Sequence, residues 1–304
     1  MPVPIVHHPA FVAPLAADHR FPMAKFGRLM ARLRAEGVAE PAWTFAPIPA
    51  PPRWIELAHA PDYVAGVAAG RLDPQIVRRI GLPLSPGIAS RSFAATGGTV
   101  LSARLALEWG LACNTAGGSH HACADGGAGF CVFNDVAVAA RVLCAEGLVD
   151  RVLVVDLDVH QGDGTASICR DDPAVFTFSL HAAANYPTRK QAGDLDIGLA
   201  DGVEDDAYLR ELAVWLPDLL SEFRPDLVFY NAGVDPHRDD RLGRLALTDT
   251  GLAARDRYVI ETVVRTGVPL ACVIGGGYGG DLDALGARHA ILHTVAAELF
   301  TRLT

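Results

Sequence analysis

Cysteine is scarce in this sequence and is not arranged as a disulfide framework or a thiolate metal site. The six cysteines are Cys113, Cys123, Cys131, Cys144, Cys169 and Cys272. None of them forms a Cys-x-x-Cys pair, and several lie inside apolar runs such as Leu270–Ile274. We therefore expect reduced thiols in the protein core.

Long apolar runs and a leader-like N-terminus are also missing. The chain begins Met-Pro-Val-Pro without basic residues, which is unlike a secretory signal peptide. No uninterrupted apolar run approaches the roughly 18 residues that a membrane helix requires. We expect a soluble, cytoplasmic protein without a membrane span.

Positive charge is in deficit, with 26 Lys and Arg against 35 Asp and Glu and a net charge of −9. This balance argues against a nucleic-acid partner and suits cationic substrates such as lysine side chains or polyamines. Mean hydropathy is +0.23, which argues against disorder. Internal repeats, linkers and low-complexity tracts are absent too, so we expect a single domain over residues 1–304.

The N-terminal third of the chain shows helical patterns separated by loops. Residues 1–20 and the proline-rich stretch 45–53 are expected to be irregular. Apolar residues recur at helical spacing before Gly37 and before Gly110, and each glycine ends its helix. The helices expected here cover 21–37, 54–59, 61–69 and 89–110.

The rest of the chain mixes apolar runs with helix-like stretches. The runs expected to form buried strands are Arg151–Asp158, Val175–Leu180, Leu227–Asn231 and Leu270–Ile274. The helical patterns cover 134–147, 205–224 and 250–266. This alternation predicts an α/β fold with a central, mostly parallel sheet and helices on both faces. In such sheets the chemistry lies beyond the carboxyl ends of the strands.

The densest group of chemical side chains ends the first of these strands. It contains Asp156, Asp158, His160 and Asp163 within eight positions. Alternate residues on an extended chain point the same way, so Asp158 and His160 can reach one metal ion. A single acid at a strand end often only caps a helix, but this density of acids and histidine favours a metal site.

A third metal ligand is expected at Asp235, in Asn231-Ala-Gly-Val-Asp235 after another strand. Taken alone, this aspartate fits a turn residue equally well. One histidine and two carboxylates would leave a coordination position open for water, as a catalytic site needs. Zinc suits this set of ligands, and Fe(II) and Mn(II) suit it too.

Two adjacent histidines, His120 and His121, end one glycine-rich stretch, and a second such stretch covers Gly126–Cys131. A histidine paired with a carboxylate is more basic and is fixed in orientation, which suits acid–base catalysis. Asp156 and Asp163 are the carboxylates available for such pairs. A histidine pair in a loop is often only a surface feature. Without a Lys-Ser/Thr, the stretch is not a phosphate-binding loop.

Gly275-Gly-Gly-Tyr278-Gly-Gly follows the last strand and formally contains the dinucleotide pattern G-x-G-x-x-G. We reject that interpretation, because no second strand with a ribose-binding acid follows about 20 residues later. Glycines around one tyrosine instead indicate a tight turn that presents a phenol to a site. A phenolic donor can stabilise the oxyanion that forms when water attacks an amide.

Taken in order, these segments resemble the histone deacetylase family and related bacterial amidohydrolases. The matching residues are His120-His121, Gly129-Phe130-Cys131, Asp156-x-Asp158-x-His160-Gln-Gly-Asp163-Gly, Asn231-Ala-Gly-x-Asp235 and Gly276-Gly277-Tyr278. The stretch from about Thr96 to Gly279 is most similar to the class IV branch, including Asp240-Arg-Leu-Gly-Arg-Leu. His59-x-x-x-Tyr63 resembles the N-terminal helical region of the family, so the resemblance covers nearly the whole chain.

The resemblance implies a deacylase that removes acetyl or longer fatty acyl groups from the Nε of lysine. It implies a catalytic ion, zinc above all, held by Asp158, His160 and Asp235. His121, oriented by Asp163, would be the general base that then protonates the leaving amine. His120, paired with Asp156, would act as an electrostatic partner.

Further roles follow from the same resemblance. Tyr278 and the metal would polarise the acyl carbonyl. The residues expected along a narrow tunnel for the lysine stem are Gly129, Phe130, Tyr186, Gly276 and Gly277. The loop around Tyr186, Ala182-Ala-Ala-Asn-Tyr-Pro, departs from the common pattern. A structural potassium ion would be bound by the Asp156 side chain and the backbone of Asp156, Asp158, His160, Ser179 and Leu180.

Three other functions remain to be weighed. A polyamine deacetylase needs acids at the rim of its site, for which Asp194, Asp196, Asp239 and Asp240 are candidates, and an insertion that narrows the entrance. No such insertion is visible. A ureohydrolase needs a second cluster of Asp ligands, and a non-catalytic acyl-lysine reader has no use for a His pair and Tyr278. Acyl-lysine proteins or peptides are therefore the expected partners, with small acylated amines as the alternative and the oligomeric state open.

Overall fold

A central β-sheet organises the computed structural model, which describes residues 1–16 and 18–303. Within these residues the sheet has eight strands in the order β2-β1-β3-β8-β7-β4-β5-β6, and every neighbouring pair is parallel. The strands are β1 (Ile5–Val6), β2 (Thr44–Phe45), β3 (Leu111–Asn114), β4 (Val152–Asp156), β5 (Val175–Ala182), β6 (Leu195–Leu199), β7 (Leu227–Asn231) and β8 (Leu270–Val273). The predicted α/β architecture is confirmed, and the sheet is wholly parallel.

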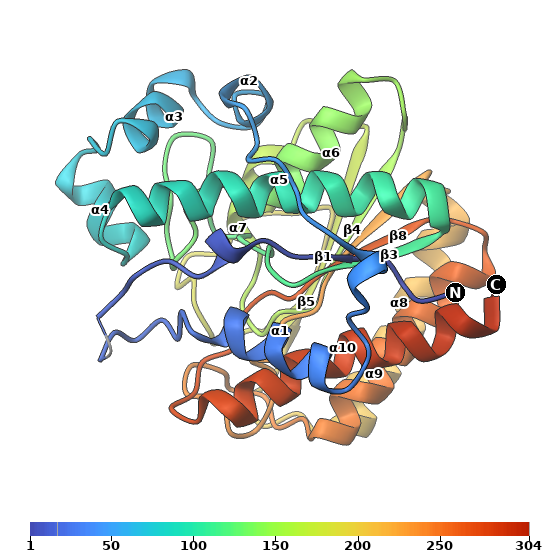
Figure 1. Cartoon of the computed structure of the whole chain (residues 1–304). Coiled ribbons are helices and arrows are strands. Elements are labelled where there is room, and N and C mark those ends of the chain that lie inside the picture. The colour runs from blue at the N-terminus through green and yellow to red at the C-terminus, as the bar shows by residue number, and fades with distance from the viewer. Residues whose placement is uncertain (17, 304) are drawn as a thin grey trace.

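Helices cover both faces of this sheet (Figure 1). They are α1 (Lys25–Ala35), α2 (Pro52–Ile55), α3 (Pro61–Ala68), α4 (Pro74–Ile80), α5 (Pro86–Trp109), α6 (Asp135–Ala145), α7 (Asp163–Cys169), α8 (Asp205–Phe223), α9 (Asp249–Arg265) and α10 (Leu282–Leu303), with short 3₁₀ turns η1 (Pro9–Phe11) and η2 (Pro41–Trp43). Helices α5 and α6 pack together on one face, whereas α1, α9 and α10 pack together on the other.

The long helices begin and end where local chemistry requires. The Ser85 side chain accepts a hydrogen bond from the Ile88 N–H at the start of α5, and Pro86 occupies its first turn. Gly110 ends this helix with a φ of 85°, a left-handed conformation that glycine adopts without strain. Helices α5, α6, α8 and α9 all lie within a few residues of their predicted positions.

Several elements were not predicted from the sequence, namely strands β1, β2, β3 and β6 and helices α4, α7 and α10. The segment 1–20, expected to be irregular, contributes β1 between β2 and β3. A two-residue strand has no periodicity to detect, and β6 is a partly exposed edge strand. Helix α2 starts at Pro52, inside the loop predicted for 45–53, because proline is well suited to a first helical turn.

The carboxyl ends of four neighbouring strands, β3, β8, β7 and β4, lie side by side. Asp156 is level with Asn231, and Asn231 is level with Val273. The chain runs from β4 outward to β5 and β6, and then returns to β7 and β8 on the other side of β4. This is the switch point at which α/β sheets place their sites, so the loops after these strands converge.

Two further expectations concern cysteine and membrane helices. All six cysteines are free, with Cys113, Cys131, Cys169 and Cys272 buried and Cys123 and Cys144 part-buried. Within the described ranges, no helix combines the length and the apolar character needed to cross a bilayer.

Candidate active site

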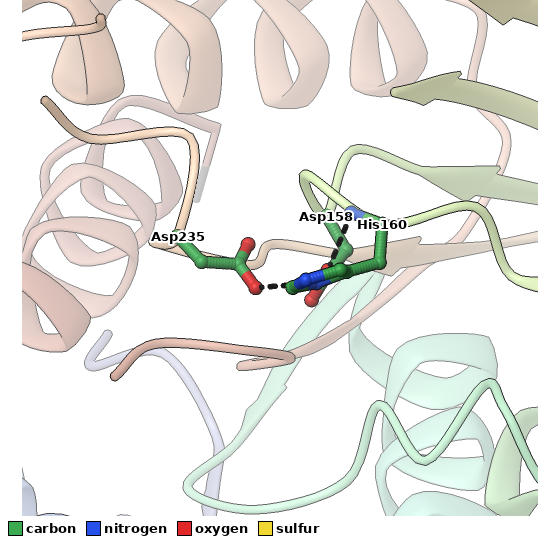
Figure 2. Close-up of side chains that lie close together, drawn as sticks. All are labelled: Asp158, His160 and Asp235. Atoms are coloured by element: carbon green, nitrogen blue, oxygen red, sulfur yellow. Dashed lines mark hydrogen bonds and ion pairs between the residues drawn. The ribbon is translucent and has the colours of Figure 1, made fainter. Parts of the chain in front are cut away.

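Two carboxylates and one imidazole meet at the carboxyl ends of β4 and β7, where Figure 2 shows them pointing toward one another. His160 Nδ1 lies 3.0 Å from Asp158 Oδ1 and 3.1 Å from Asp235 Oδ2. Asp158 is 1% exposed and Asp235 is fully buried. Among the described residues, these three side chains form the one group of three or more His, Cys, Asp or Glu whose ligand atoms all lie within 4.8 Å of one another.

The donor atoms of this cluster fit a divalent cation. Burial and the charge of Asp158 raise the pKa of Asp235 to about 7, which reflects negative charge that water cannot screen. His160 Nδ1 can donate one proton at most, yet it faces an oxygen of both carboxylates. A cation shared by all three side chains removes this conflict. One nitrogen and two oxygen donors suit Zn²⁺, Fe²⁺ or Mn²⁺.

Backbone N–H groups orient both carboxylates. Asp158 Oδ2 accepts a hydrogen bond of 2.6 Å from the Gly276 N–H, and Asp235 Oδ1 accepts one of 2.9 Å from the Val159 N–H. The other oxygens, Asp158 Oδ1 and Asp235 Oδ2, face His160 Nδ1, and Asp158 Oδ1 also accepts from the His160 N–H at 3.0 Å. Such contacts fix the direction of metal ligands before an ion binds.

Arg255, a fully buried residue of α9, donates hydrogen bonds to both loops that carry the three clustered side chains. Its Nη1 donates to the Leu157 carbonyl at 3.2 Å and to the Gly233 carbonyl at 2.7 Å. The same guanidinium pairs with Asp256 at 2.8 Å. Sequence reasoning missed Arg255, since an arginine in a helical pattern gives no sign that it is buried.

The adjacent histidines each pair with an aspartate. His120 Nδ1 lies 2.7 Å from Asp156 Oδ2, and His121 Nδ1 lies 2.6 Å from Asp163 Oδ1. The two imidazole centroids are 4.1 Å apart. Because both Nδ1 atoms are engaged by carboxylates, the Nε2 atoms are the ones available for chemistry.

The two histidines differ in basicity, although a carboxylate partner was expected to make both more basic. Burial lowers the pKa of His120, but the negative charges of Asp156 and Asp158 outweigh it and raise the pKa to about 9. Burial and the positive charge of His120 lower the pKa of His121 to about 4 despite its bond to Asp163. Near pH 7, His121 is therefore neutral and able to accept a proton.

Asp135, at the start of α6, holds the loop that carries the histidines. Its carboxylate accepts hydrogen bonds from the Gly118 N–H at 3.1 Å and the Ser119 N–H at 2.7 Å. Asn134 Nδ2 donates to the His120 carbonyl at 3.4 Å. Neither residue was predicted in the site, although a polar pair inside the apolar stretch 132–140 was the available signal.

Tyr278, on the loop after β8, lies among the rings of the site. Its ring centroid is 6.2 Å from that of His160 and 5.8 Å from that of Phe130. Burial and the negative charges of Asp158 and Asp235 raise the pKa of the phenol well above its usual range. The hydroxyl therefore stays protonated and can act as a hydrogen-bond donor.

A cavity of about 340 Å³, which we call the mouth, opens beside these groups. Its lining residues are Arg20, Arg79, Ile80, Gly81, His121, Gly129, Phe130, His160, Asn185, Tyr186, Leu242 and Tyr278. The Tyr186 ring lies 4.8 Å from that of His121, so the structure places this residue beside the site. Gly129 and Phe130 have φ values of 53° and 67°, and this left-handed turn presents the Phe130 ring to the mouth.

A second cavity of about 30 Å³, the inner chamber, borders the same groups. It shares His121, Gly129, Phe130 and Tyr278 with the mouth, so these residues separate the two spaces. His120, Asp158 and Gly276 also line the chamber. Gly277, expected along the tunnel, is not among the residues that line either cavity, and its carbonyl instead accepts a hydrogen bond from Lys25.

Two buried cations line the inner chamber, and neither was predicted. Lys25 is 1% exposed, and its Nζ donates to the carbonyls of Gly275 and Gly277 at 3.3 and 3.2 Å. Burial lowers the pKa of Lys25 to about 8. Arg91 is 5% exposed, and its Nε donates to the Phe11 carbonyl at 3.0 Å. The available signal was a lone charge in an otherwise small and apolar stretch of α5.

The residues predicted to hold potassium lie side by side on β4 and β5. Asp156 is paired with Ser179 in the sheet, and Leu180 follows in the same buried strand. Asp156 and Ser179 line a cavity of about 10 Å³. The oxygen atoms of a carboxylate, a hydroxyl and nearby carbonyls are the donors that hard cations prefer.

The acids considered as rim residues bind other parts of the protein. Asp240 accepts hydrogen bonds from the backbone N–H groups of Leu242, Gly243 and Tyr278. Asp196 accepts from Gln161, Asp194 accepts from Thr177, and Asp239 pairs with Arg288. None of the four acids lines the mouth.

His59 and Tyr63 support the loop that forms the partition between the cavities. His59 Nδ1 lies 2.9 Å from the Cys123 carbonyl, and its Nε2 accepts from the Asn134 N–H at 2.9 Å. The Tyr63 hydroxyl donates to the Val132 carbonyl at 2.7 Å. The two side chains thereby hold both ends of the stretch between Cys123 and Asn134.

Comparison with known proteins identifies relatives along almost the entire chain. Residues 19–293 match the model of the histone deacetylase domain. An uncharacterized protein of Picosynechococcus sp. is 53% identical over 300 residues, 99% of this chain and 100% of that protein. Histone deacetylase 2 of Arabidopsis thaliana is 30% identical over 269 residues, 86% of this chain and 70% of that protein.

Two further matches extend this set. A probable deacetylase of Methanothermobacter thermautotrophicus is 32% identical over 217 residues, which cover 67% of this chain and 63% of that protein. The crystal structure of the HDA15 HD domain matches 98% of this chain and 88% of that chain with a TM-score of 0.79. Its sequence identity is 21%, so this last likeness shows a shared fold.

Proposed function

The chain belongs to the histone deacetylase family and is therefore a deacetylase-type hydrolase, and we propose that it removes acyl groups from the Nε of lysine in proteins or peptides. One observation supports this most strongly: the cluster of Asp158, His160 and Asp235 lies beside His121 and Tyr278, whose ring centroids are 5.8 Å and 6.2 Å from that of His160. These are the groups that amide hydrolysis needs, namely a metal site, a base and an oxyanion donor.

We propose Zn²⁺ as the resident ion, with Fe²⁺ or Mn²⁺ as alternatives that the same donors accept. When bound, the ion would polarise the acyl carbonyl and lower the pKa of a water molecule in the site. Asp158, His160 and Asp235 would hold it through the oxygen and nitrogen atoms that converge in this structure.

Different side chains would carry the proton and stabilise the negative charge of the transition state. His121, with Nδ1 held by Asp163, accepts the proton of the attacking water at Nε2 and returns it to the departing lysine amine. Protonated His120, paired with Asp156, stabilises the negative charge that develops nearby. The Tyr278 hydroxyl donates a hydrogen bond to the substrate oxyanion.

The two cavities would bind different parts of the substrate. The aromatic and apolar walls of the mouth, including Phe130, Tyr186 and Leu242, suit the alkyl stem of lysine. The acyl end would then point toward the inner chamber of about 30 Å³. A space of this size holds about two water-sized groups, so we propose acetyl rather than a long fatty chain as the preferred acyl group.

Other features of the proposal rest on the family resemblance. Potassium bound beside Asp156, Ser179 and Leu180 would stabilise the strand ends that carry the ligands. A cytoplasmic location stays a prediction. Acetylated polyamines, the alternative substrates, would meet no carboxylate among the residues that line the mouth.

A substrate panel with controlled metal content tests this function. The protein is stripped with a chelator, reloaded separately with Zn²⁺, Fe²⁺ or Mn²⁺, and assayed on acetyl-, butyryl- and myristoyl-lysine peptides and on acetylated spermidine. We expect metal-dependent turnover with the highest kcat/KM for the acetyl-lysine peptide. Preference for acetylated spermidine over every peptide would contradict the substrate, and full activity without metal would contradict the mechanism.

A further inference from the structure

The charged side chains at the mouth have one sign. Apart from the catalytic histidines, the titratable residues that line it are Arg20, Arg79, Tyr186 and Tyr278, and its lining includes no Asp or Glu. The chain as a whole carries a net charge of −9. The charged side chains that line the mouth are therefore opposite in sign to the net charge of the chain.

Arg79 is held at the mouth by the loop that contains Gly129 and Phe130. It lies in the last turn of α4, and its carbonyl accepts a hydrogen bond of 3.0 Å from the Gly129 N–H. The next carbonyl, of Ile80, accepts one of 2.7 Å from the Phe130 N–H. Gly81 follows so closely against the Phe130 ring that a Cβ there would lie 3.2 Å from it. The end of α4 is thus fastened to the wall of the cavity.

Arg20 reaches the same wall from a distant part of the sequence. Its neighbours His19 and Phe21 place their rings 6.1 Å and 5.3 Å from the centroid of Phe130. Phe21 also packs against Tyr278, with centroids 6.4 Å apart. The backbone on both sides of Arg20 is therefore positioned by rings of the site itself.

Neither guanidinium is paired within the described part of the chain. Arg20 and Arg79 are exposed and have no hydrogen bond or ion pair from their side chains. Among the other exposed arginines of the described residues, some have acidic partners, as Arg244 has Asp201, and some, such as Arg53 and Arg71, have none. In an acidic protein, two unpaired arginines at one cavity leave their charge available to a ligand.

We propose that Arg20 and Arg79 select acyl-lysine substrates that carry carboxylates next to the modified lysine. This inference rests on the proposed deacylase function and specifies its substrate class. An acidic flank would pair with the guanidiniums while the lysine stem occupies the mouth. A polycation such as an acylated polyamine would place its free ammonium groups against the same two positive charges.

Three acetyl-lysine peptides that differ only in flanking residues, glutamate, glutamine or lysine, test the proposal on the metal-loaded enzyme. Exposed ion pairs are individually weak, so we expect kcat/KM to favour the glutamate over the lysine peptide by about tenfold at low salt. The difference should lie mainly in KM and shrink with added salt. Equal turnover of all three peptides would overturn this inference and leave the deacylase function intact. Faster turnover of acetylated spermidine than of every peptide would overturn both.

Variants assign the effect to the two arginines. The double variant Arg20→Gln with Arg79→Gln should bring the ratio of glutamate to lysine peptide close to one, and Arg20→Glu with Arg79→Glu should reverse it. Arg151→Gln is a control for loss of an arginine elsewhere, because Arg151 directly precedes β4 and so lies at the amino ends of the strands. A double variant that keeps the wild-type ratio would overturn the assignment, and so would a control that loses it.

Discussion

Charged side chains are buried and hydrogen-bonded in the inner part of the site, whereas at the mouth they are exposed and unpaired. In the inner part, Asp158 and Lys25 are each 1% exposed, and both are fixed by bonds to the backbone. At the mouth, Arg20 and Arg79 are exposed and unpaired. Electrostatic interactions are strong where water is excluded and weak where it is not. We therefore expect the buried groups to control whether the reaction occurs, and the exposed groups to bias which substrate is used.

This contrast predicts two kinds of kinetic change. Loss of a buried group should reduce kcat, since that group acts on the transition state. Loss of a mouth arginine should change KM in a salt-dependent way, because screened charges affect encounter and binding. Variants of buried groups should accordingly have far larger effects than variants of the mouth.

The largest effect is expected for Asp235→Ala. Removing one of three ligands from a buried cluster should abolish stoichiometric metal binding after chelation and reloading, as measured by elemental analysis. Several kcal/mol of transition-state stabilisation depend on the ion, so kcat/KM should fall at least about 1,000-fold. Asp239→Ala, an exposed acid near the ligand, is the control and should bind metal normally. Retention of a full equivalent of metal by Asp235→Ala would rule out this assignment.

A smaller but still large effect is expected for His121→Ala and for Tyr278→Phe. Each variant should keep its metal and its fold but lose about 100-fold or more in kcat, the usual scale for an acid–base group or oxyanion donor. Steady-state kinetics with circular dichroism and metal analysis provide the measurement. Tyr258→Phe, a change on α9, should behave like the wild type. A folded variant at His121 or Tyr278 with near wild-type kcat would refute the proposed mechanism.

His59, which supports the loop between the mouth and the inner chamber, should make the stability of the fold depend on pH. Burial lowers the pKa of His59 to about 4 from 6.5, so the folded state keeps this histidine neutral. As pH falls below 6.5, the unfolded chain takes up the proton first and stability is lost until about pH 4. From pH 7 to pH 5 this amounts to about 2 kcal/mol.

Urea unfolding of the wild type and of His59→Gln at pH 7 and pH 5 measures this contribution of His59 to the free energy of unfolding. The variant should be less stable than the wild type at pH 7, because two hydrogen bonds of His59 are altered. It should then lose about 2 kcal/mol less than the wild type on acidification. Equal losses in the two proteins would contradict the assignment of this pH dependence to His59.

The smallest of these effects concerns the size of the inner chamber. Arg91→Ala removes a buried side chain from its lining and should admit a longer acyl group. A methylene accommodated in a pocket changes selectivity by tenfold or more, so the butyryl-to-acetyl ratio of kcat/KM should rise about tenfold. Arg91→Met, which removes the charge but retains bulk, is the matched control and should keep the wild-type ratio. A rise of the same size in both variants would show that charge, not space, sets acyl length.

Patterns along the chain were enough to predict the main sheet strands and the residues at their ends. Buried parallel strands are continuous apolar runs, so β4, β5, β7 and β8 were detectable one at a time. Strand β1 was not, because its two residues become a strand only through pairing with β2 and β3. Edge and short strands owe their form to neighbours that are distant in sequence.

The candidate site divides in the same way. Asp158 and His160 are two residues apart on an extended segment, so local geometry alone predicted that they would converge. Their meeting with Asp235, His121 and Tyr278 was expected from the order of the motifs, and the structure brings these side chains together at four adjacent strand ends.

By itself, the sequence determined the chemical inventory: which acids, histidines and tyrosine follow which strands, and hence the type of reaction. The tertiary structure decided the environment of each group. It made His121 less basic and His120 more basic, although both have carboxylate partners. It also buried Arg91 beneath the site and left Arg79 exposed at the entrance. Basicity and charge strength depend on burial and on neighbours from distant segments, and these exist only once the chain has folded.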